Sequence, residues 1–314
     1  MREKKKRWEA DKMERKESAG HLAALLTIVI WGTTFISTKV LLVDFEPVEI
    51  LFYRFVMGLL ALCVVYPRRL KGATGKQELT FAAAGLCGVC LYYLLENIAL
   101  TQTLASNVSV IVSVAPFFIA LLSHIVFKGQ EKLRVNFFLG FVLAMVGIFL
   151  ISTGGAEVHI SPVGDLLALL ASIIWAFYSI LMQKIGGYGY PTVLVTRRIF
   201  LYGILFMVPA LFFFDLQCAP ERFANPVYLG NFLFLGLGAC ALCFVTWNFA
   251  VKMLGPVKTS VYIYMVPVIT VVASVLILHE PLTWATGVGA LLTLGGLFLS
   301  EFKIKRKGKT TENV

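Results

Sequence analysis

Five ionisable side chains interrupt long apolar stretches of this sequence: Lys39, Arg54, Glu96, Arg197 and Arg198. An ionisable group inside a bilayer is costly, so each of them needs a partner, water or a route to the headgroups. Arg54 and Arg198 are therefore candidates for binding an anionic group such as a carboxylate along a pathway through the membrane. The alternatives are that Arg54 pairs with Glu96, and that Lys39 and Arg197 extend their charged ends to the nearest headgroups.

Glu96 is the only acidic side chain well inside an apolar stretch. A lone carboxylate in such a place is a candidate site for a coupling proton. If it pairs with Arg54 instead, it is a structural partner of that arginine. The sequence leaves both roles open, and proton coupling is one of the partners it suggests.

Large aromatic and amide side chains near the middle of the apolar stretches are further candidates for contact with a solute. Trp31 and Trp175 are unusual, because tryptophan is enriched at membrane interfaces rather than at the centre of a span. The alternative for each ring is packing between helices, and for each amide it is a hydrogen bond across helices. The predicted pathway set is Trp31, Arg54, Tyr93, Glu96, Asn97, Trp175, Arg198, Trp247, Asn248 and Tyr264.

Pro116 and Pro267 lie in the middle of two apolar stretches and are candidates for gating kinks. A proline inside a helix removes one backbone hydrogen bond and crowds the carbonyl four residues earlier. The freed carbonyls then face a cavity and bend during gating. The alternative is a static kink that a neighbouring serine satisfies.

Other chemistry is not supported by the motifs present. Cys87 and Cys90, and likewise Cys240 and Cys243, have the paired spacing of a zinc site, but both pairs lie inside apolar stretches. The sequence contains neither the glycine-rich nucleotide-binding motif nor the zinc-protease motif. We therefore predict no cofactor, no metal and no enzymatic activity. A membrane-embedded enzyme acting on a lipid-linked substrate, or a channel, remains the alternative class.

These side chains must be positioned by membrane-spanning helices. The 314 residues are 58% hydrophobic and only 15% charged, which excludes an ordinary soluble protein. Each apolar stretch has the length of a spanning helix and lacks the alternating polarity of a barrel strand. The sequence predicts an all-α integral membrane protein with ten transmembrane helices, near residues 21–42, 48–66, 79–101, 104–127, 134–152, 163–184, 191–214, 228–250, 257–278 and 283–302.

The basic residues set the expected orientation. Most of the 28 Lys and Arg residues lie in the two tails and in the connections on the same side, whereas the opposite connections contain Arg222 alone. By the positive-inside rule, both termini of this multi-pass protein face the cytoplasm. The net charge of +10 thus reflects orientation in a cell membrane, and no nucleic acid partner is predicted.

The two halves of the chain are related by an internal repeat. Five spans in each half place the second half in the membrane with the opposite orientation, and such inverted repeats are typical of secondary transporters. The predicted divisions are a charged cytoplasmic tail (1–19), two five-helix repeats (20–152 and 160–302) and a basic cytoplasmic tail (303–314). The matching pairs are Trp31 and Trp175, Pro47 and Pro191, and Arg54 and Arg198 at an offset of 144; Asn97 and Asn248, Ser109 and Ser260, and Pro116 and Pro267 at 151; and Glu131 and Glu280, Gly140 and Gly289, and Gly147 and Gly296 at 149.

The sequence resembles the EamA-type branch of the drug/metabolite transporter superfamily over about residues 20–302. The residues that carry the resemblance are Trp31-Gly32-Thr33-Thr34-Phe35, Glu46-Pro47, Arg54-Phe55, Asn97-Ile98-Ala99-Leu100, Ser113-Val114-Ala115-Pro116, His279-Glu280-Pro281-Leu282-Thr283 and Gly295-Gly296.

The resemblance implies a carrier in which helices one to four and six to nine surround a central cavity, with helices five and ten at the periphery. It also implies substrates such as exported amino acids or small metabolites. We accordingly predict a secondary transporter in the cytoplasmic membrane that exports a small organic metabolite, an amino acid or a related carboxylate-bearing compound, by alternating access. The substrate itself, the coupling ion and the oligomeric state are not predicted.

Overall fold

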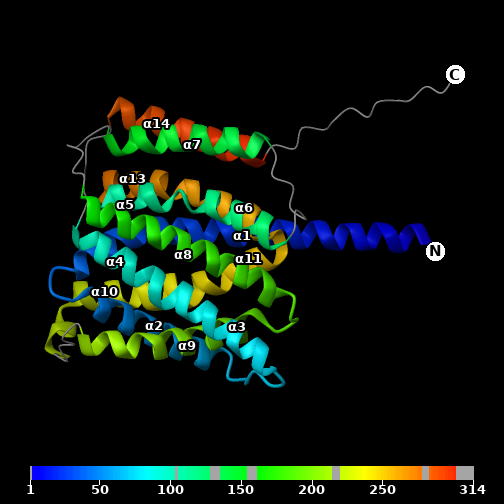
Figure 1. Ribbon diagram of the computed structural model, residues 1–314, viewed down its shortest axis with the longest axis horizontal. Coiled ribbons are helices and arrows are strands. Elements are labelled where there is room, and N and C mark those ends of the chain that lie inside the picture. The colour runs from blue at the N-terminus through cyan, green and yellow to red at the C-terminus, as the bar shows by residue number, and fades with distance from the viewer. Residues whose placement is uncertain are drawn as a thin grey trace.

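The computed structural model describes residues 2–102, 105–127, 135–153, 161–213, 220–277 and 283–301, and within these ranges it is helical without strands. The helices run side by side in one bundle, and the N-terminal part of α1 extends beyond it (Figure 1). Seven helical rods are long and apolar enough to cross a membrane, and three apolar helices are shorter. The predicted all-helical membrane class is confirmed at this level.

The bounds of the elements are as follows. The first half contains α1 (Arg2–Leu41), α2 (Pro47–Val65), α3 (Gly75–Gly85), η1 (Leu86–Leu91), α4 (Tyr92–Gln102), α5 (Ala105–Val112), α6 (Ala115–Val126) and α7 (Val135–Thr153). The second half contains α8 (Pro162–Gly186), α9 (Thr192–Phe213), η2 (Pro220–Ala224), α10 (Pro226–Leu233), η3 (Phe234–Leu242), α11 (Cys243–Leu254), α12 (Pro256–Ser260), η4 (Val261–Tyr264), α13 (Met265–Ile277) and α14 (Trp284–Glu301).

Local sequence explains where several helices begin. α2, α8 and α10 each start at a proline, whose fixed φ suits the first helical position and whose missing N–H has no partner there anyway. Ser161 and Asn225, each just before the proline, accept from a free amide of the first turn. At the start of α2, the backbone N–H of Glu46 donates to Glu49 Oε2 at 2.9 Å. These starts fix the ends of the rods that surround the centre of the bundle.

The same departures from α-helix occur in both halves. The rod α3–η1–α4 contains a π segment, and so does the rod α10–η3–α11 at the equivalent place. The rod of α5 and α6 is broken by a turn at Ser113 and Val114, while η4 forms a 3-10 segment in the rod of α12 and α13. Pro116 and Pro267 follow these two interruptions closely, so each proline sits near the start of a new α-helix.

Equivalent helices of the two halves pack against equivalent helices of the opposite half. α1 packs against α11 and α13, while its counterpart α8 packs against α4 and α6. α2 packs against its own counterpart α9, and α7 against α14 at one edge of the bundle (Figure 1). The last pair can approach closely because Gly140 has no Cβ. A Cβ at this position would lie only 2.6 Å from the Gly296 carbonyl oxygen.

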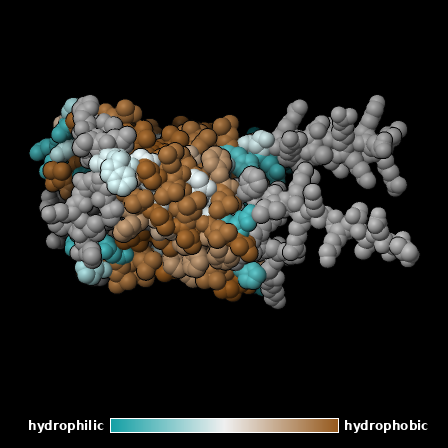
Figure 2. Space-filling view, turned by 90° about the horizontal axis from the view of Figure 1, so that it is seen from above, coloured by the Kyte–Doolittle hydropathy of each residue, from teal (hydrophilic) through white to brown (hydrophobic). Residues whose placement is uncertain are grey.

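The outer surface carries a broad apolar band. Figure 2 shows hydrophobic residues around the middle of the bundle and hydrophilic residues toward its two ends. Large exposed side chains such as Val64, Leu139, Phe149, Leu205 and Phe298 lie on this surface. An exposed band of this kind faces lipid in a membrane protein rather than water.

Candidate functional site

A small cavity lies at the centre of the bundle, between the two halves. Its volume is about 40 Å³, which is room for a few water molecules. The wall combines residues from α1, α4 and α5 with residues from α8, η4 and α13. The lining side chains are Ile28, Trp31, Thr34, Phe35, Tyr92, Tyr93, Glu96, Ser109, Val112, Ser113, Trp175, Ile263 and Val266.

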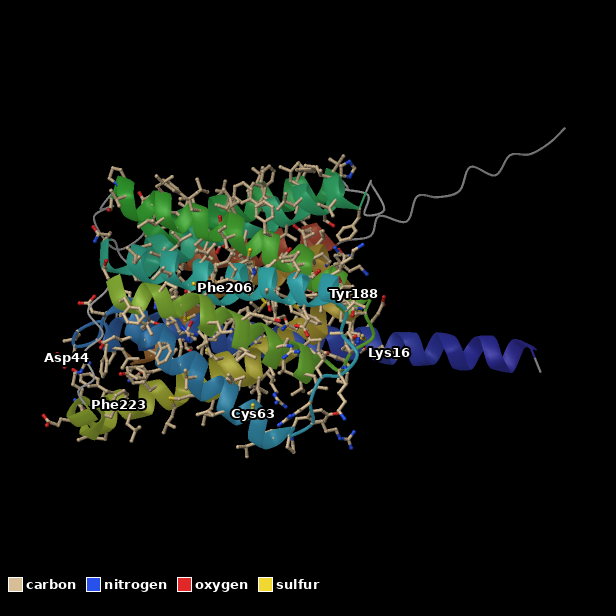
Figure 3. All side chains as sticks on the ribbon, turned by 60° about the horizontal axis from the view of Figure 1, so that its bottom comes forward. Lys16, Asp44, Cys63, Tyr188, Phe206 and Phe223 are labelled. Atoms are coloured by element: carbon tan, nitrogen blue, oxygen red, sulfur yellow. The ribbon has the colours of Figure 1, made fainter. Side chains whose placement is uncertain are left out.

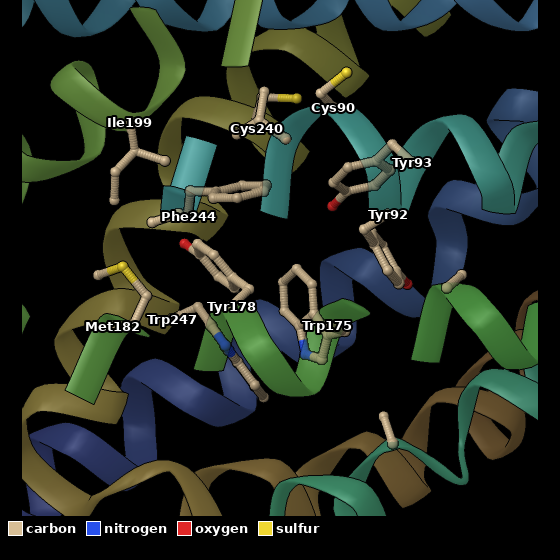
Figure 4. Packing of buried hydrophobic residues seen from close by; sticks show 14 of the residues in the cluster. Cys90, Tyr92, Tyr93, Trp175, Tyr178, Met182, Ile199, Cys240, Phe244 and Trp247 are labelled. Atoms are coloured by element: carbon tan, nitrogen blue, oxygen red, sulfur yellow. The ribbon is translucent and has the colours of Figure 1, made fainter. Parts of the chain in front are cut away.

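Aromatic rings form much of this wall. The repeat-related Trp31 and Trp175 meet edge to face, with ring centroids 5.5 Å apart, and Tyr92 lies 4.8 Å from Trp175. The Trp31 indole N–H donates to the Ala239 carbonyl, inside the π segment η3, at 3.1 Å. Trp247 packs 5.2 Å from Trp31 but is not among the lining residues; Figure 4 shows it near Trp175 and Tyr178. The two predicted central tryptophans, 31 and 175, therefore do line one space.

Glu96 is the only Asp, Glu, Lys or Arg among the described residues of the lining. Its Oε1 accepts a 2.7 Å hydrogen bond from the Tyr92 hydroxyl, one helical turn earlier on α4. No described residue donates to the other carboxylate oxygen, and 7% of the residue remains exposed. The carboxylate thus keeps an unused acceptor at the cavity wall.

Arg54 lies one layer behind the wall and is 1% exposed. Its Nε donates to Cys240 Sγ at 3.1 Å, and its guanidinium carbon lies 4.7 Å from the centroid of the Tyr93 ring, which itself lines the cavity. Nη2 has no hydrogen-bond partner. Among the described residues, the ion pair with Glu96 that the sequence left open is not formed within 4.0 Å.

Arg198 occupies a different setting from Arg54. Its Nη2 lies 2.6 Å from Glu78 Oε1 in an ion pair, and the Tyr202 hydroxyl donates to the other oxygen of Glu78 at 2.7 Å. The side chains of Arg198 and Glu78 are 34% and 24% exposed. In this conformation Arg198 joins α9 to α3 at one end of the bundle and is not part of the cavity lining.

The other two intramembrane cations bind backbone carbonyls near helix ends. Lys39 Nζ donates to the Leu100 carbonyl near the end of α4 at 2.8 Å. Arg197 donates to the carbonyls of Tyr66 and Arg68, just beyond the end of α2, at 2.5 and 2.8 Å. Carbonyls at a helix C-terminus lack helical partners and carry negative partial charge, so they suit these cations.

The two candidate amides connect helices away from the cavity. Asn97 on α4 donates to the Pro47 carbonyl of α2 at 3.2 Å. Asn248 on α11 accepts from the Tyr178 hydroxyl at 2.7 Å and donates to the Thr196 hydroxyl at 3.1 Å. Both are buried, and in this conformation they form hydrogen bonds across helices, which is the predicted alternative to contact with a solute.

The interruption before Pro116 does reach the cavity. Ser113, in the turn ahead of this proline, donates its hydroxyl to the Ser109 carbonyl at 2.7 Å, and both serines line the space. Pro267 and the neighbouring Tyr264 lie in the rod of the second half. Tyr264 packs in a separate apolar cluster with α7 and α14, and its hydroxyl has no hydrogen-bond partner.

A polar cluster closes one end of the bundle. Arg222 on η2 donates to both carboxylate oxygens of Glu49 at 2.8 and 3.1 Å and to the Asp44 carbonyl at 2.6 Å. The hydrogen bonds to Glu49 raise the pKa of Arg222 above its ordinary value, so the cation persists. The Tyr228 hydroxyl donates to the Asp44 carboxylate. Asp44 and Phe223 mark this end in Figure 3, opposite Lys16 and Tyr188.

Sequence reasoning did not assign several of these partners. Glu78 lies just before the predicted third span, outside the apolar stretches in which charged residues were sought. Cys240 was considered only as part of a zinc-like pair, yet it accepts from Arg54. The signal that was present is the four-residue spacing of Tyr92 and Glu96, which places both on one helix face.

Comparison with known proteins gives a consistent result. The profile described as "EamA-like transporter family" matches residues 18–153 and 162–302. An "Uncharacterized transporter" of Archaeoglobus fulgidus is 30% identical over 297 residues, with 91% of this chain and 98% of the relative covered. The "Uncharacterized transporter YvbV" of Bacillus subtilis is 26% identical, covering 88% and 90%. A solved crystal structure with a TM-score of 0.74 covers 91% of this chain and 98% of its own; at 20% identity it shows a shared fold alone.

Proposed function

This chain belongs to the EamA-like transporter family, and on that premise we propose that it is a secondary carrier that exports a small organic metabolite from the cytoplasm. The family and the transporter-named relatives indicate a multi-pass membrane transporter rather than an enzyme. The observation that carries the proposal is the central cavity, because its wall is built from both halves and contains an unsatisfied carboxylate oxygen.

The proposed architecture has ten crossings in two inverted five-helix repeats, with both termini in the cytoplasm. Seven long apolar rods and three shorter ones supply enough helices. The matched π segments, the matched interruptions before Pro116 and Pro267, and the exchanged packing of α1 and α8 support a pseudo-two-fold relation. The positive-inside distribution of Lys and Arg supports the orientation.

Reporter fusions test this architecture. Fusions after residues 72 and 187 are expected to report the cytoplasm, and fusions after residues 155 and 218 the opposite side. One reversed position would break the inversion. Fusion after residue 40 in a truncated chain serves as a reference for the first crossing.

Transport requires the cavity to open, since about 40 Å³ cannot hold a metabolite. We propose that two ion pairs alternate as end closures. Glu49 and Arg222 join α2 to η2 at one end, while Glu78 and Arg198 join α3 to α9 at the other. Each pair links the two halves, so separating the halves at one end breaks one pair while the other holds.

The proposed substrate carries a carboxylate, as an amino acid does. Arg54 has a buried Nη2 without a partner, and a desolvated guanidinium is best matched by a carboxylate. Tyr93 lies between Arg54 and the cavity, so we propose that this ring moves aside when substrate enters. Arg198 is then exposed only when its own end opens.

Glu96 is the proposed site for a coupling proton. The ionisable groups that face it are Tyr92 and Tyr93 on its own helix and Arg54 on α2. The carboxylate reaches the cavity, where water can deliver a proton, whereas other described acids lie toward the ends of the bundle. Substrate and proton would then bind at the same cavity wall.

Counterflow into proteoliposomes tests the carrier proposal. A carrier exchanges labelled solute against an internal pool with saturation, which a channel does not do. If Glu96 carries the proton, Glu96→Gln abolishes accumulation driven by a pH gradient and leaves exchange at saturating substrate largely intact. Unchanged pH dependence in this variant would refute the coupling role, and absence of saturable exchange with every amino acid and small carboxylate would refute the carrier.

A further inference from the structure

The cavity wall has the composition of a cation site. Glu96 is the only charged side chain among its described residues, and five aromatic side chains share the lining with it. Arg54, the nearest cation, is separated from the space by the Tyr93 ring. An entering group therefore meets a carboxylate and π faces before it can meet a guanidinium.

The rings come from three helices that line the space. Trp31 on α1 and Trp175 on α8 are nearly perpendicular, at 78°. On α4, the Tyr92 and Tyr93 rings are 4.7 Å apart at 84°. Several rings in unlike orientations around one point are the arrangement by which proteins bind ammonium groups, because each ring face carries negative potential.

The carboxylate completes this arrangement. Glu96 gives one oxygen to the Tyr92 hydroxyl and has no described donor for the other. A protonated amino group offers three N–H donors together with a positive charge, so it can satisfy this oxygen. It also compensates a carboxylate that is 7% exposed and has no cation within 4.0 Å among the described residues. The small volume suits such a head group.

We propose that this cavity is an ammonium subsite, in which Glu96 and the rings of Trp31, Trp175, Tyr92 and Tyr93 bind the protonated amino group of the substrate. The inference rests on the proposed carrier function and deepens it. When the cavity opens far enough to admit the body of the substrate, this wall recognises its cationic end, and an amine without a carboxylate is sufficient for binding. Contact with Arg54 then requires movement of Tyr93.

Three ligands that share one hydrocarbon body test the amino group and the carboxylate separately: phenethylamine, phenylalanine and 3-phenylpropionate. Titration calorimetry on the purified full-length protein is expected to show binding of phenethylamine and no binding of 3-phenylpropionate. Glu96→Gln should weaken phenethylamine binding by about 10- to 150-fold, because a charge-assisted hydrogen bond is lost. Glu221→Gln, on the exposed segment η2, is the matched control and should leave the affinity unchanged.

Two results would overturn the inference: 3-phenylpropionate binding as tightly as phenethylamine, or a folded Glu96→Gln variant that keeps the wild-type affinity for phenethylamine. The ligand ranking on the wild-type protein decides the matter even if the variant does not fold. Counterflow separates this inference from the carrier proposal. Amine binding without exchange of any of the three ligands refutes the carrier alone, whereas saturable exchange with 3-phenylpropionate preferred refutes the ammonium subsite alone.

Discussion

Arg54 and Arg198 occupy matched positions in the two halves, yet they differ in burial and in their hydrogen-bond and ion-pair partners. Arg54 is 1% exposed, has an Nη2 without a partner and lies beside Cys240 and Tyr93. Arg198 is 34% exposed as a side chain and holds Glu78 at 2.6 Å. Two matched sequence positions therefore present one arginine as a buried charge with an Nη2 that has no partner, and the other as half of a partly exposed ion pair.

The difference shows which features the repeat preserves. The π segments and the interruptions near Pro116 and Pro267 recur in both halves because backbone geometry determines how the helices pack. Around the cavity the tryptophan pair Trp31 and Trp175 recurs, but the polar side chains do not. At an offset of 151, Tyr93 corresponds to Phe244 and Glu96 to Trp247, so the polar groups are concentrated on the first half. We infer that the first half supplies most of the substrate chemistry, while the second half adds Trp175, Ile263 and Val266 to the cavity wall.

The largest expected effect concerns the two ion pairs at opposite ends. Glu49 is 1% exposed and Arg222 18%, against 24% and 34% for Glu78 and Arg198. Arg222→Ala leaves a buried carboxylate without its guanidinium and is expected to cost about 3 kcal/mol or more of unfolding free energy. Arg198→Ala breaks a more exposed pair and should cost below about 1 kcal/mol.

Equilibrium unfolding in mixed micelles measures both values. Glu221→Gln, next to Arg222 but exposed, controls for a charge change at the same end. Equal losses of unfolding free energy in the two alanine variants would contradict this prediction. They would show that the two ion pairs stabilise the protein equally despite their different burial.

Much of the fold is predictable from the sequence because hydrocarbon imposes a strict rule. Every apolar stretch must satisfy its own backbone, so helices are required, and prolines such as Pro47 and Pro162 show where they begin. The helix bounds agree with the predicted stretches to within a few residues at most ends. The π segments were not predictable, since nothing in the composition of Leu86–Leu91 distinguishes it from an α-helix.

Four of the ten predicted pathway residues line the cavity and six do not, and the partners of the charged residues were not predictable. Trp31, Tyr93, Glu96 and Trp175 do surround one space. The partner of an arginine depends on how helices rotate, and apolar helices give few constraints on rotation. For that reason the sequence suggested Glu96 but not Cys240 as the neighbour of Arg54. The equivalence of Arg54 and Arg198 suggested a symmetry that the side chains do not follow.

The central claim is that Arg54 is a buried charge retained for substrate, whereas its counterpart Arg198 is a structural partner. The most direct measurement is the unfolding free energy of Arg54→Met and Arg198→Met in mixed micelles, with no ligand present. Replacing an unsatisfied buried charge by an apolar side chain of similar length is expected to leave stability unchanged or to raise it by about 1–4 kcal/mol, while Arg198→Met lowers it. A loss of several kcal/mol in Arg54→Met would contradict the account, because it would make Arg54 the structural arginine.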